Sequence, residues 1–370
     1  MSASVRRILF FPLSNVLGHL ARTLALAEEF DAQGHEVHLA LDGYYRELTS
    51  ALPASVRIHS TPELDPDATR RFGPILCYED NVAADRANLE SADRLDAAEL
   101  RRRGERLAEM VQRDAAIVED LRPDAVITDY RYTVERLRGA RPRHIFHISH
   151  LLGYPSLYQR SRGARFAPLD TGRILVPGVA AIETVRAGTS HWGSRSQESL
   201  CGPFRWRGWE RLRPARASPP PSDVFLCFGS TGRAEHIVPA LQQALGARCR
   251  ISTIPAEPTD LEPYLTRTEV AFCHGGHGTV LECILHGTPM AIFPQNIEQL
   301  EIGHGIEALG LGILVKQPYE QLSGHELCAL IERLKSDPAL RCQLQKYSAL
   351  LRSENGPQRA AAIVLEQLQR

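Results

Sequence analysis

Residues 270–279 read Val-Ala-Phe-Cys-His-Gly-Gly-His-Gly-Thr, an apolar run that ends in a glycine-rich turn. The pattern predicts a buried strand before His274 and a helix that begins at or just after Thr279. Glycines let the backbone approach a ligand closely, and the unpaired N–H groups at a helix start supply donors and a partial positive charge. We therefore expect the backbone at Gly275, Gly276 and Gly278 to approach a phosphate, with His274 as a side-chain donor.

A purely structural interpretation of the same turn is also open. Thr279 and Glu282 have the S/T-x-x-E spacing of a capping box, in which the two side chains satisfy the first N–H groups of a helix. A glycine-rich turn by itself is a weak sign of ligand binding. The residues around the turn must decide between the two interpretations.

The alternation of short apolar runs with helical patterns predicts an α/β fold with two domains. At 370 residues the chain exceeds the size at which one hydrophobic core keeps growing. Strand, helix and strand follow one another near the N-terminus, and the alternation restarts after a run of three prolines. We predict an N-terminal domain over 1–214, a linker over 215–222, a second domain over 223–354, and a helix over 355–370 that packs back on the first domain.

Composition excludes several classes of function. The net charge of −1 and the pI near 6.9 give no electrostatic footprint for nucleic acid. The eight cysteines show no CxxC spacing and lie largely in apolar runs, as buried thiols in a reducing compartment do. No segment approaches 18 consecutive apolar residues, so none is expected to span a membrane. A cytoplasmic location is expected.

A second group of polar residues follows the strand after the turn, where Pro294-Gln-Asn-Ile-Glu-Gln299 stands. Ligands of open α/β sheets bind at the carboxyl ends of strands. The spacing from His274 to Gln299 resembles the nucleotide-sugar signature of the UDP-glycosyltransferase superfamily, most closely its bacterial natural-product glycosyltransferases. That resemblance implies the GT-B fold, in which two Rossmann-like domains face each other across a cleft.

The resemblance also implies roles for the residues of the signature. His274 and Thr279 would contact the diphosphate, Glu282 the ribose hydroxyls, and Glu298 and Gln299 the hydroxyls of the donor sugar. Carboxylates, amides and hydroxyls have the hydrogen-bonding capacity that these contacts need. Glu282 keeps the helix cap as its alternative.

Other segments match the family less completely. Gly229 and Ser230, after the first strand of the second domain, resemble its second glycine loop on the donor phosphates, although an ordinary turn would look the same. The plant members have Trp-Asn where this chain has His277-Gly278. The aromatic residue that stacks on the base is absent near residues 254–256, so uridine and thymidine donors both stay open.

The candidate general base is His19, in a segment that resembles the family's N-terminal Gly-His at the acceptor site. A helix start disfavours the imidazolium form, which favours a neutral, proton-accepting ring. Asp129, at the end of an apolar strand, is the expected carboxylate partner and acts in the opposite direction. The alternatives are a surface histidine that caps the helix and an aspartate in a strand-end turn.

These residues predict an inverting glycosyltransferase that acts on a small-molecule or lipid-like acceptor, in solution or at the inner membrane surface. A homodimer is compatible with this prediction. The helix start and His274 would meet the charge of the leaving group, so no metal or other cofactor is expected. The Asp65-Pro-Asp67 triplet is read as a turn rather than a metal site. The rival hypotheses are a nonhydrolysing sugar-nucleotide epimerase and a catalytically silent partner of a transferase.

Overall fold

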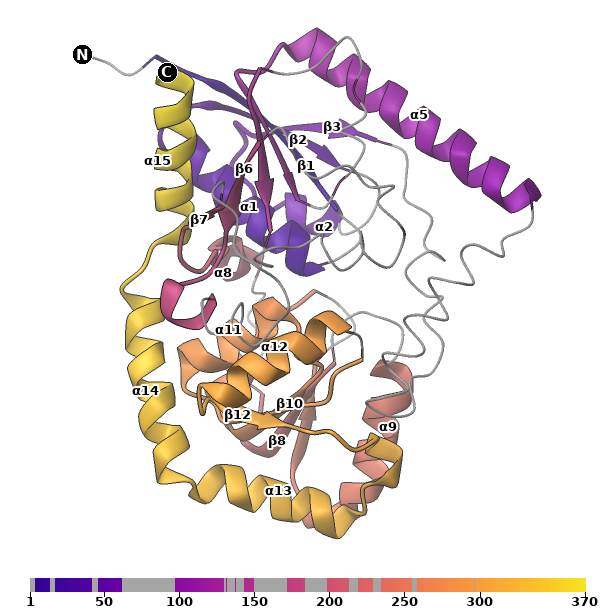
Figure 1. Cartoon of the computed structure of the whole chain (residues 1–370), viewed down its shortest axis with the longest axis vertical. Helices are drawn as coiled ribbons and strands as arrows, with labels where there is room; N and C mark the ends of the chain where they lie inside the picture. The colour runs from indigo at the N-terminus through magenta and orange to yellow at the C-terminus, as the bar shows by residue number, and fades with distance from the viewer. Residues whose placement is uncertain are drawn as a thin grey trace.

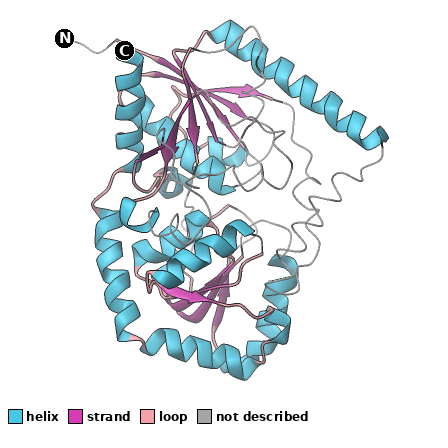
Figure 2. Cartoon of the chain, viewed as in Figure 1, coloured by secondary structure: helices cyan, strands magenta, loops and turns pink. Residues whose placement is uncertain are grey.

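The computed structural model describes residues 4–13, 17–41, 46–61, 97–129, 131, 137, 143–149, 172–183, 198–212, 219–228, 234–254, 258–295 and 297–370. Within these residues the chain forms two parallel sheets, one in each half of the sequence, with helices packed around them (Figure 1). Figure 2 shows helices beside both sheets. The predicted α/β fold class is confirmed.

The N-terminal sheet has the strand order β3-β2-β1-β4-β5-β6-β7, and every pair is parallel. Its central strands are nearly continuous apolar runs because helices cover both faces of a parallel sheet. The strands are β1 (Arg7–Pro12), β2 (Glu36–Leu41), β3 (Arg57–Ser60), β4 (Ala125–Asp129), β5 (Ile145–Ile148), β6 (Gly172–Val176) and β7 (Glu198–Leu200). The order reverses between β1 and β4, which makes that point the switch point where such sheets bind ligands.

Helices cover both faces of this sheet. One face packs against α1 (Leu17–Ala32) and the other against the C-terminal half of α5 (Ala97–Leu121). Two short helices, α2 (Arg46–Thr49) and α8 (Gly208–Leu212), complete this half. Residues 62–96, which precede α5, lie outside the described chain. None of the helices described is long and apolar enough to cross a membrane.

The C-terminal sheet has the order β12-β11-β10-β8-β9, again with parallel pairs. Its switch point lies between β8 and β10. The elements are β8 (Ser222–Cys227), α9 (Ala234–Leu245), η2 (Gly246–Arg248), β9 (Ile251–Thr253), α10 (Glu262–Leu265), β10 (Thr268–Cys273), α11 (His277–His286), β11 (Met290–Ile292), α12 (Ile297–Ala308), β12 (Gly312–Leu314), η3 (Tyr319–Gln321), α13 (Gly324–Ser336), α14 (Pro338–Arg352) and α15 (Gly356–Gln369).

The chain passes between the two halves more than once. The predicted linker over 215–222 runs into the second sheet at its end, because β8 already begins at Ser222. After α14 the chain returns, and α15 packs against α1 with Ala360, Ala361 and Val364 buried in the core of the N-terminal half. Figure 1 shows α15 alongside the N-terminal sheet, so the core of the N-terminal domain contains residues from both ends of the sequence.

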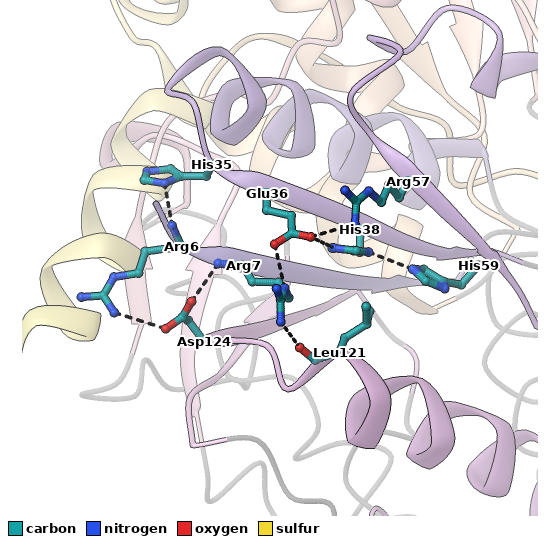
Figure 3. Close-up of polar contacts among 9 residues, drawn as sticks. All are labelled: Arg6, Arg7, His35, Glu36, His38, Arg57, His59, Leu121 and Asp124. Atoms are coloured by element: carbon teal, nitrogen blue, oxygen red, sulfur yellow. Dashed lines mark hydrogen bonds and ion pairs between the residues drawn. The ribbon is translucent and has the colours of Figure 1, made fainter. Parts of the chain in front are cut away.

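A polar network ties together the amino-terminal ends of the N-terminal strands (Figure 3). Arg7 donates to Glu36 at 2.8 Å through Nε, and its backbone N–H donates to Asp124 at 2.8 Å. His38 Nδ1 and His59 Nε2 lie 2.9 Å apart, and burial lowers the pKa of both rings, so one neutral imidazole donates to the other. These contacts link β2, β1 and β4 at the edge opposite their carboxyl ends.

Candidate active site

Asp129 marks the switch point of the N-terminal sheet. It is the last residue of β4, and it pairs in register with Pro12 at the end of β1. Side chains alternate between the faces of a strand, so Asp129 shares a face with Ala125 and Ile127, which lie in the core beneath α1. The Asp129 side chain is therefore turned toward α1, and none of it is exposed.

His19 lies in the first turn of α1 and contacts this carboxylate. Its Nδ1 is 2.6 Å from Asp129 Oδ1, so the structure brings together the residues predicted as base and partner. A carboxylate oxygen only accepts hydrogen bonds; a neutral ring that donates from Nδ1 has its lone pair on Nε2. The His19 side chain is 14% exposed, while that of Asp129 is fully buried. The arrangement leaves the histidine accessible and the aspartate enclosed.

Arg22 is a third member of this group that the sequence analysis missed. Its guanidinium donates from Nε to Asp129 Oδ2 at 2.5 Å and from Nη2 to Oδ1 at 2.6 Å. The signal in the sequence is a single basic residue inside the apolar run of α1, three positions after His19 and therefore on the same face of the helix. A buried arginine needs a carboxylate partner, and Asp129 is that partner.

Three atoms of this group form a triangle. Arg22 Nη2, His19 Nδ1 and Asp129 Oδ1 lie 2.6 Å from one another. Only two sides can be hydrogen bonds, because Nδ1 carries either one hydrogen or one lone pair. If both nitrogens donate to Oδ1, the anion receives two donors, whereas a lone pair on Nδ1 would face the carboxylate. The first arrangement is electrostatically the better one, and it places the positive guanidinium beside the imidazole.

The network keeps Asp129 ionised. Complete burial by itself raises the pKa of this carboxyl, but the charge of Arg22, then that of His19, and the hydrogen bonds from both outweigh burial and lower the pKa to about 2. Asp129 is therefore an anion at any pH in which the protein would normally work. It can orient His19, and it cannot itself take up the proton.

The phosphate turn occupies the corresponding place in the C-terminal sheet, at the end of β10. Gly275 has φ +85°, and a Cβ there would lie 2.7 Å from Ile292 Cγ2 and 3.1 Å from the Gln299 carbonyl oxygen. Only glycine fits this conformation at such a close approach. The turn thereby packs against the first turn of α12, which carries Gln299.

The helix after the turn begins earlier than predicted. Gly276 is the N-cap of α11, in an extended conformation, and no side chain caps the helix. The helix starts at His277 rather than at Thr279, because the left-handed Gly275 completes the turn one step earlier. The capping box of Thr279 and Glu282 is therefore absent, and that interpretation is wrong. Gly278 and Thr279 lie in the first helical turn, where backbone N–H groups have no partner within the helix.

His274 is held by the neighbouring strand. Its Nδ1 donates to the carbonyl oxygen of Cys227, the last residue of β8, at 3.3 Å. With Nδ1 as the donor, Nε2 carries a hydrogen only when the ring is protonated. His274 would thus donate to a phosphate through Nε2 as an imidazolium. A nearby diphosphate favours that form.

The other predicted donor contacts are partly described. Glu282 is 27% exposed and lies 3.9 Å from Arg205 and 3.3 Å from His286, and it does not cap α11. Gln299 is buried, and its Oε1 accepts the N–H of Gln295 at 2.8 Å.

The remaining predicted contacts lie outside the described residues. Gly229 and Ser230 follow β8 in a segment that the structure does not describe. Glu298 is in the first turn of α12, but its side chain is not described. The Asp65 to Asp67 triplet also lies outside. Within the described ranges, no cluster of three or more His, Cys, Asp or Glu side chains could hold a metal ion.

A buried pair joins the two halves beside the turn. His277 Nε2, at the start of α11, is 3.2 Å from Glu183 Oε1, and both side chains are almost fully buried. Glu183 follows β6, yet its neighbours Val179 and Ile182 belong to the core of the C-terminal half. Residues 179–183 therefore anchor the N-terminal half next to the predicted donor site. This contact was not predicted, because Glu183 and His277 are 94 positions apart in the sequence.

Comparison with curated proteins finds glycosyltransferases. No protein-family model matches the chain. The NDP-glycosyltransferase YjiC of Bacillus subtilis is 26% identical over 98 residues, which span 26% of this chain and only 24% of that protein. An uncharacterized glycosyltransferase of Methanosarcina mazei is 20% identical over 95% of this chain and 96% of that protein. The PGL/p-HBAD biosynthesis rhamnosyltransferase of Mycobacterium bovis is 23% identical over 85% of this chain and 78% of that protein.

Solved structures with the same fold are also glycosyltransferases. The glycotransferase of kitacinnamycin superposes with a TM-score of 0.68 at 17% identity and covers 99% of this chain and 100% of its own. The spinosyn rhamnosyltransferase SpnG complexed with spinosyn aglycone superposes with a TM-score of 0.61 at 17% sequence identity. The match covers 98% of this chain and 100% of that chain. Arabidopsis thaliana UGT89C1 complexed with UDP-L-rhamnose superposes with a TM-score of 0.66 at 14% sequence identity. The match covers 98% of this chain and 99% of that chain. The predicted resemblance and the GT-B fold are confirmed.

Proposed function

We propose that this chain is an inverting glycosyltransferase that moves a sugar from a nucleotide-sugar donor to a hydroxyl group of a small or lipid-like acceptor. The observation that carries the proposal is the 2.6 Å contact between His19 and the buried Asp129 at the N-terminal switch point. A general base oriented by a buried carboxylate is the arrangement that activates a hydroxyl. It occurs here in a fold that the chain shares with glycosyltransferases.

The proposed reaction is a proton transfer to His19 coupled to a displacement at the anomeric carbon of the donor. His19 takes the hydroxyl proton on Nε2, and the acceptor oxygen forms a bond to the anomeric carbon. The bond from that carbon to the diphosphate oxygen breaks, and the nucleoside diphosphate leaves with the electron pair. A single displacement inverts the anomeric configuration. Asp129 stabilises the imidazolium that forms, since it is ionised and its oxygen lies beside Nδ1.

The leaving group is assigned to the turn at the end of β10. The first-turn N–H groups of α11 and the positive end of its dipole would receive the developing negative charge. His274, protonated by the arrival of the diphosphate, would add a donor. Because this assignment needs no metal ion, we expect turnover to be unchanged when a chelator such as EDTA is present.

Rhamnose is the first donor sugar to test. The names of one relative and one solved structure include rhamnosyltransferase, and another structure is complexed with UDP-L-rhamnose. We propose UDP- or dTDP-linked rhamnose as donors, ahead of the corresponding glucose compounds. The contacts of the described residues do not separate the two bases.

The test incubates purified protein with UDP- and dTDP-sugars, with and without a panel of phenolic, aliphatic and lipid-like alcohols. Mass spectrometry follows both the nucleoside diphosphate and the glycosylated acceptor. The proposal expects both products to appear together and only when an acceptor is present. A donor that isomerises without acceptor would show an epimerase instead. Donor binding without any turnover across the panel would indicate a silent partner protein.

A further inference from the structure

We infer that Arg22 is a positioning residue for the proposed base. Its guanidinium fixes the carboxylate of Asp129, and its positive charge beside the ring opposes the attraction of that carboxylate for a proton on His19. This inference rests on the proposed function and extends it, because neither the sequence signature nor the relatives' names assign a role to this arginine.

The first argument is the balance of charge. Asp129 is fully buried and ionised, and a buried carboxylate beside a histidine favours a proton on the ring. Arg22 contacts both carboxylate oxygens, so the pair carries no net charge. The group is then neutral when His19 is neutral. It becomes positive only when His19 has accepted the acceptor's proton, at the stage when the leaving group gains negative charge.

The second argument is distance. Arg22 Nη2 lies 2.6 Å from His19 Nδ1, the same distance that separates Nδ1 from Asp129 Oδ1. The ring therefore has a cation and an anion at equal separation, and the two opposing effects nearly cancel. The carboxylate can then orient Nδ1 while the guanidinium offsets its charge at the ring.

The third argument is the surroundings of α1. The elements packed against this helix present apolar side chains to it, including Phe10 of β1, Leu39 of β2 and Ala361 of α15. Glu28 lies nine residues after His19 and accepts a hydrogen bond from Trp206. Asp129 and Arg22 contact the ring directly, whereas the ion pair of Glu28 with Arg211 lies more than two helical turns further along α1. In such an environment their interaction with His19 is weakly screened.

Arg22→Met tests the inference through the pH dependence of transfer. Removing the guanidinium leaves Asp129 as an uncompensated anion beside His19, which favours the imidazolium and blocks the base. The acidic limb of kcat/KM should move to higher pH by about 1 to 3 units. Turnover should be low at pH 7 and recover at pH 9, while the Kd for UDP stays unchanged. Arg22→Lys keeps the charge but not the two-point contact, and should shift the limb less.

A matched control comes from the other face of the sheet. Arg131 donates to both oxygens of the buried Asp114, at 3.0 and 2.8 Å, in a pair of the same kind without a histidine. Arg131→Met should lower thermal stability without moving the acidic limb. If Arg22→Met and wild type show the same acidic limb, or if turnover stays equally low at every pH, the inference is wrong. Absence of transfer by the wild-type protein would instead reject the proposed function.

Discussion

The two switch points of this molecule form their sites from different groups: side chains at the end of β4 and backbone at the end of β10. At the end of β4, three side chains make the site, and their geometry depends on charge, since Arg22 and His19 both contact Asp129. At the end of β10, the backbone makes the site, and its geometry depends on a left-handed Gly275 and the start of α11. We therefore expect the first site to fail when a charged group or the general base is removed, and the second site to fail when a methyl group is added.

The largest effect is expected for His19→Ala, which separates the two sites. Loss of a general base slows a proton-transfer step by about 10² to 10⁴-fold. Because the donor turn belongs to the other domain, the Kd for the nucleoside diphosphate should stay within about twofold of wild type. Product formation followed by mass spectrometry gives the first quantity, and calorimetric titration with UDP or dTDP gives the second. Full turnover of the variant would show that His19 is not the general base.

Two glycine substitutions test the backbone site. A Cβ at residue 275 meets Ile292 and the Gln299 carbonyl in a left-handed conformation, so Gly275→Ala should cost about 1–3 kcal/mol of stability and weaken donor binding. At Gly278 nothing lies within 4 Å of a Cβ, so Gly278→Ala should not lower stability. A donor that sits over this first helical turn should nevertheless bind the second variant less tightly. Thermal unfolding and donor titration give both quantities, and equal stability of the two variants would contradict the assignment.

Acid should act on the side-chain site. The pKa of Asp129 is lowered to about 2, below its value of about 3.9 in an unfolded chain. Its contribution is thus present above the unfolded value and is lost as pH falls toward 2, with a total of about 2 kcal/mol. Urea unfolding of wild type from pH 6 down to pH 2 should show most of this loss, and Asp129→Asn should lack that part of the slope. Identical slopes would indicate that Arg22 and Asp129 are not coupled in the folded state.

The smallest effect concerns Glu282. Its ion pairs with Arg205 and His286 are partly exposed, so Glu282→Gln should change stability by less than about 1 kcal/mol. A lost hydrogen bond to ribose should weaken donor binding by about 3- to 10-fold. The control is Glu332→Gln, at a side chain 71% exposed on α13, which should leave donor binding unchanged. Unchanged donor binding in both variants would remove Glu282 from the proposed site.

The sequence predicted the elements and their order because apolar periodicity and glycine positions act locally. The strand before His274 and the helix predicted over 355–370 are examples, because they correspond to β10 and α15. It could not show Arg22 as part of the site, because the role of Arg22 depends on Asp129, which lies 107 positions away. It misplaced the start of α11 because the conformation of Gly275 depends on contacts with β11 and α12.

The position of α15 affects the order in which the two halves can complete their folding during synthesis. Its buried alanines and Val364 complete the core under α1, although the ribosome adds them after the whole C-terminal sheet. During synthesis, residues 222–353 therefore leave the ribosome while the first domain still exposes the groove that α15 will fill. Domains usually fold in the order of translation. Here the C-terminal half is translated second, but its described strands and helices are all synthesised before α15, which the N-terminal half needs to complete its core.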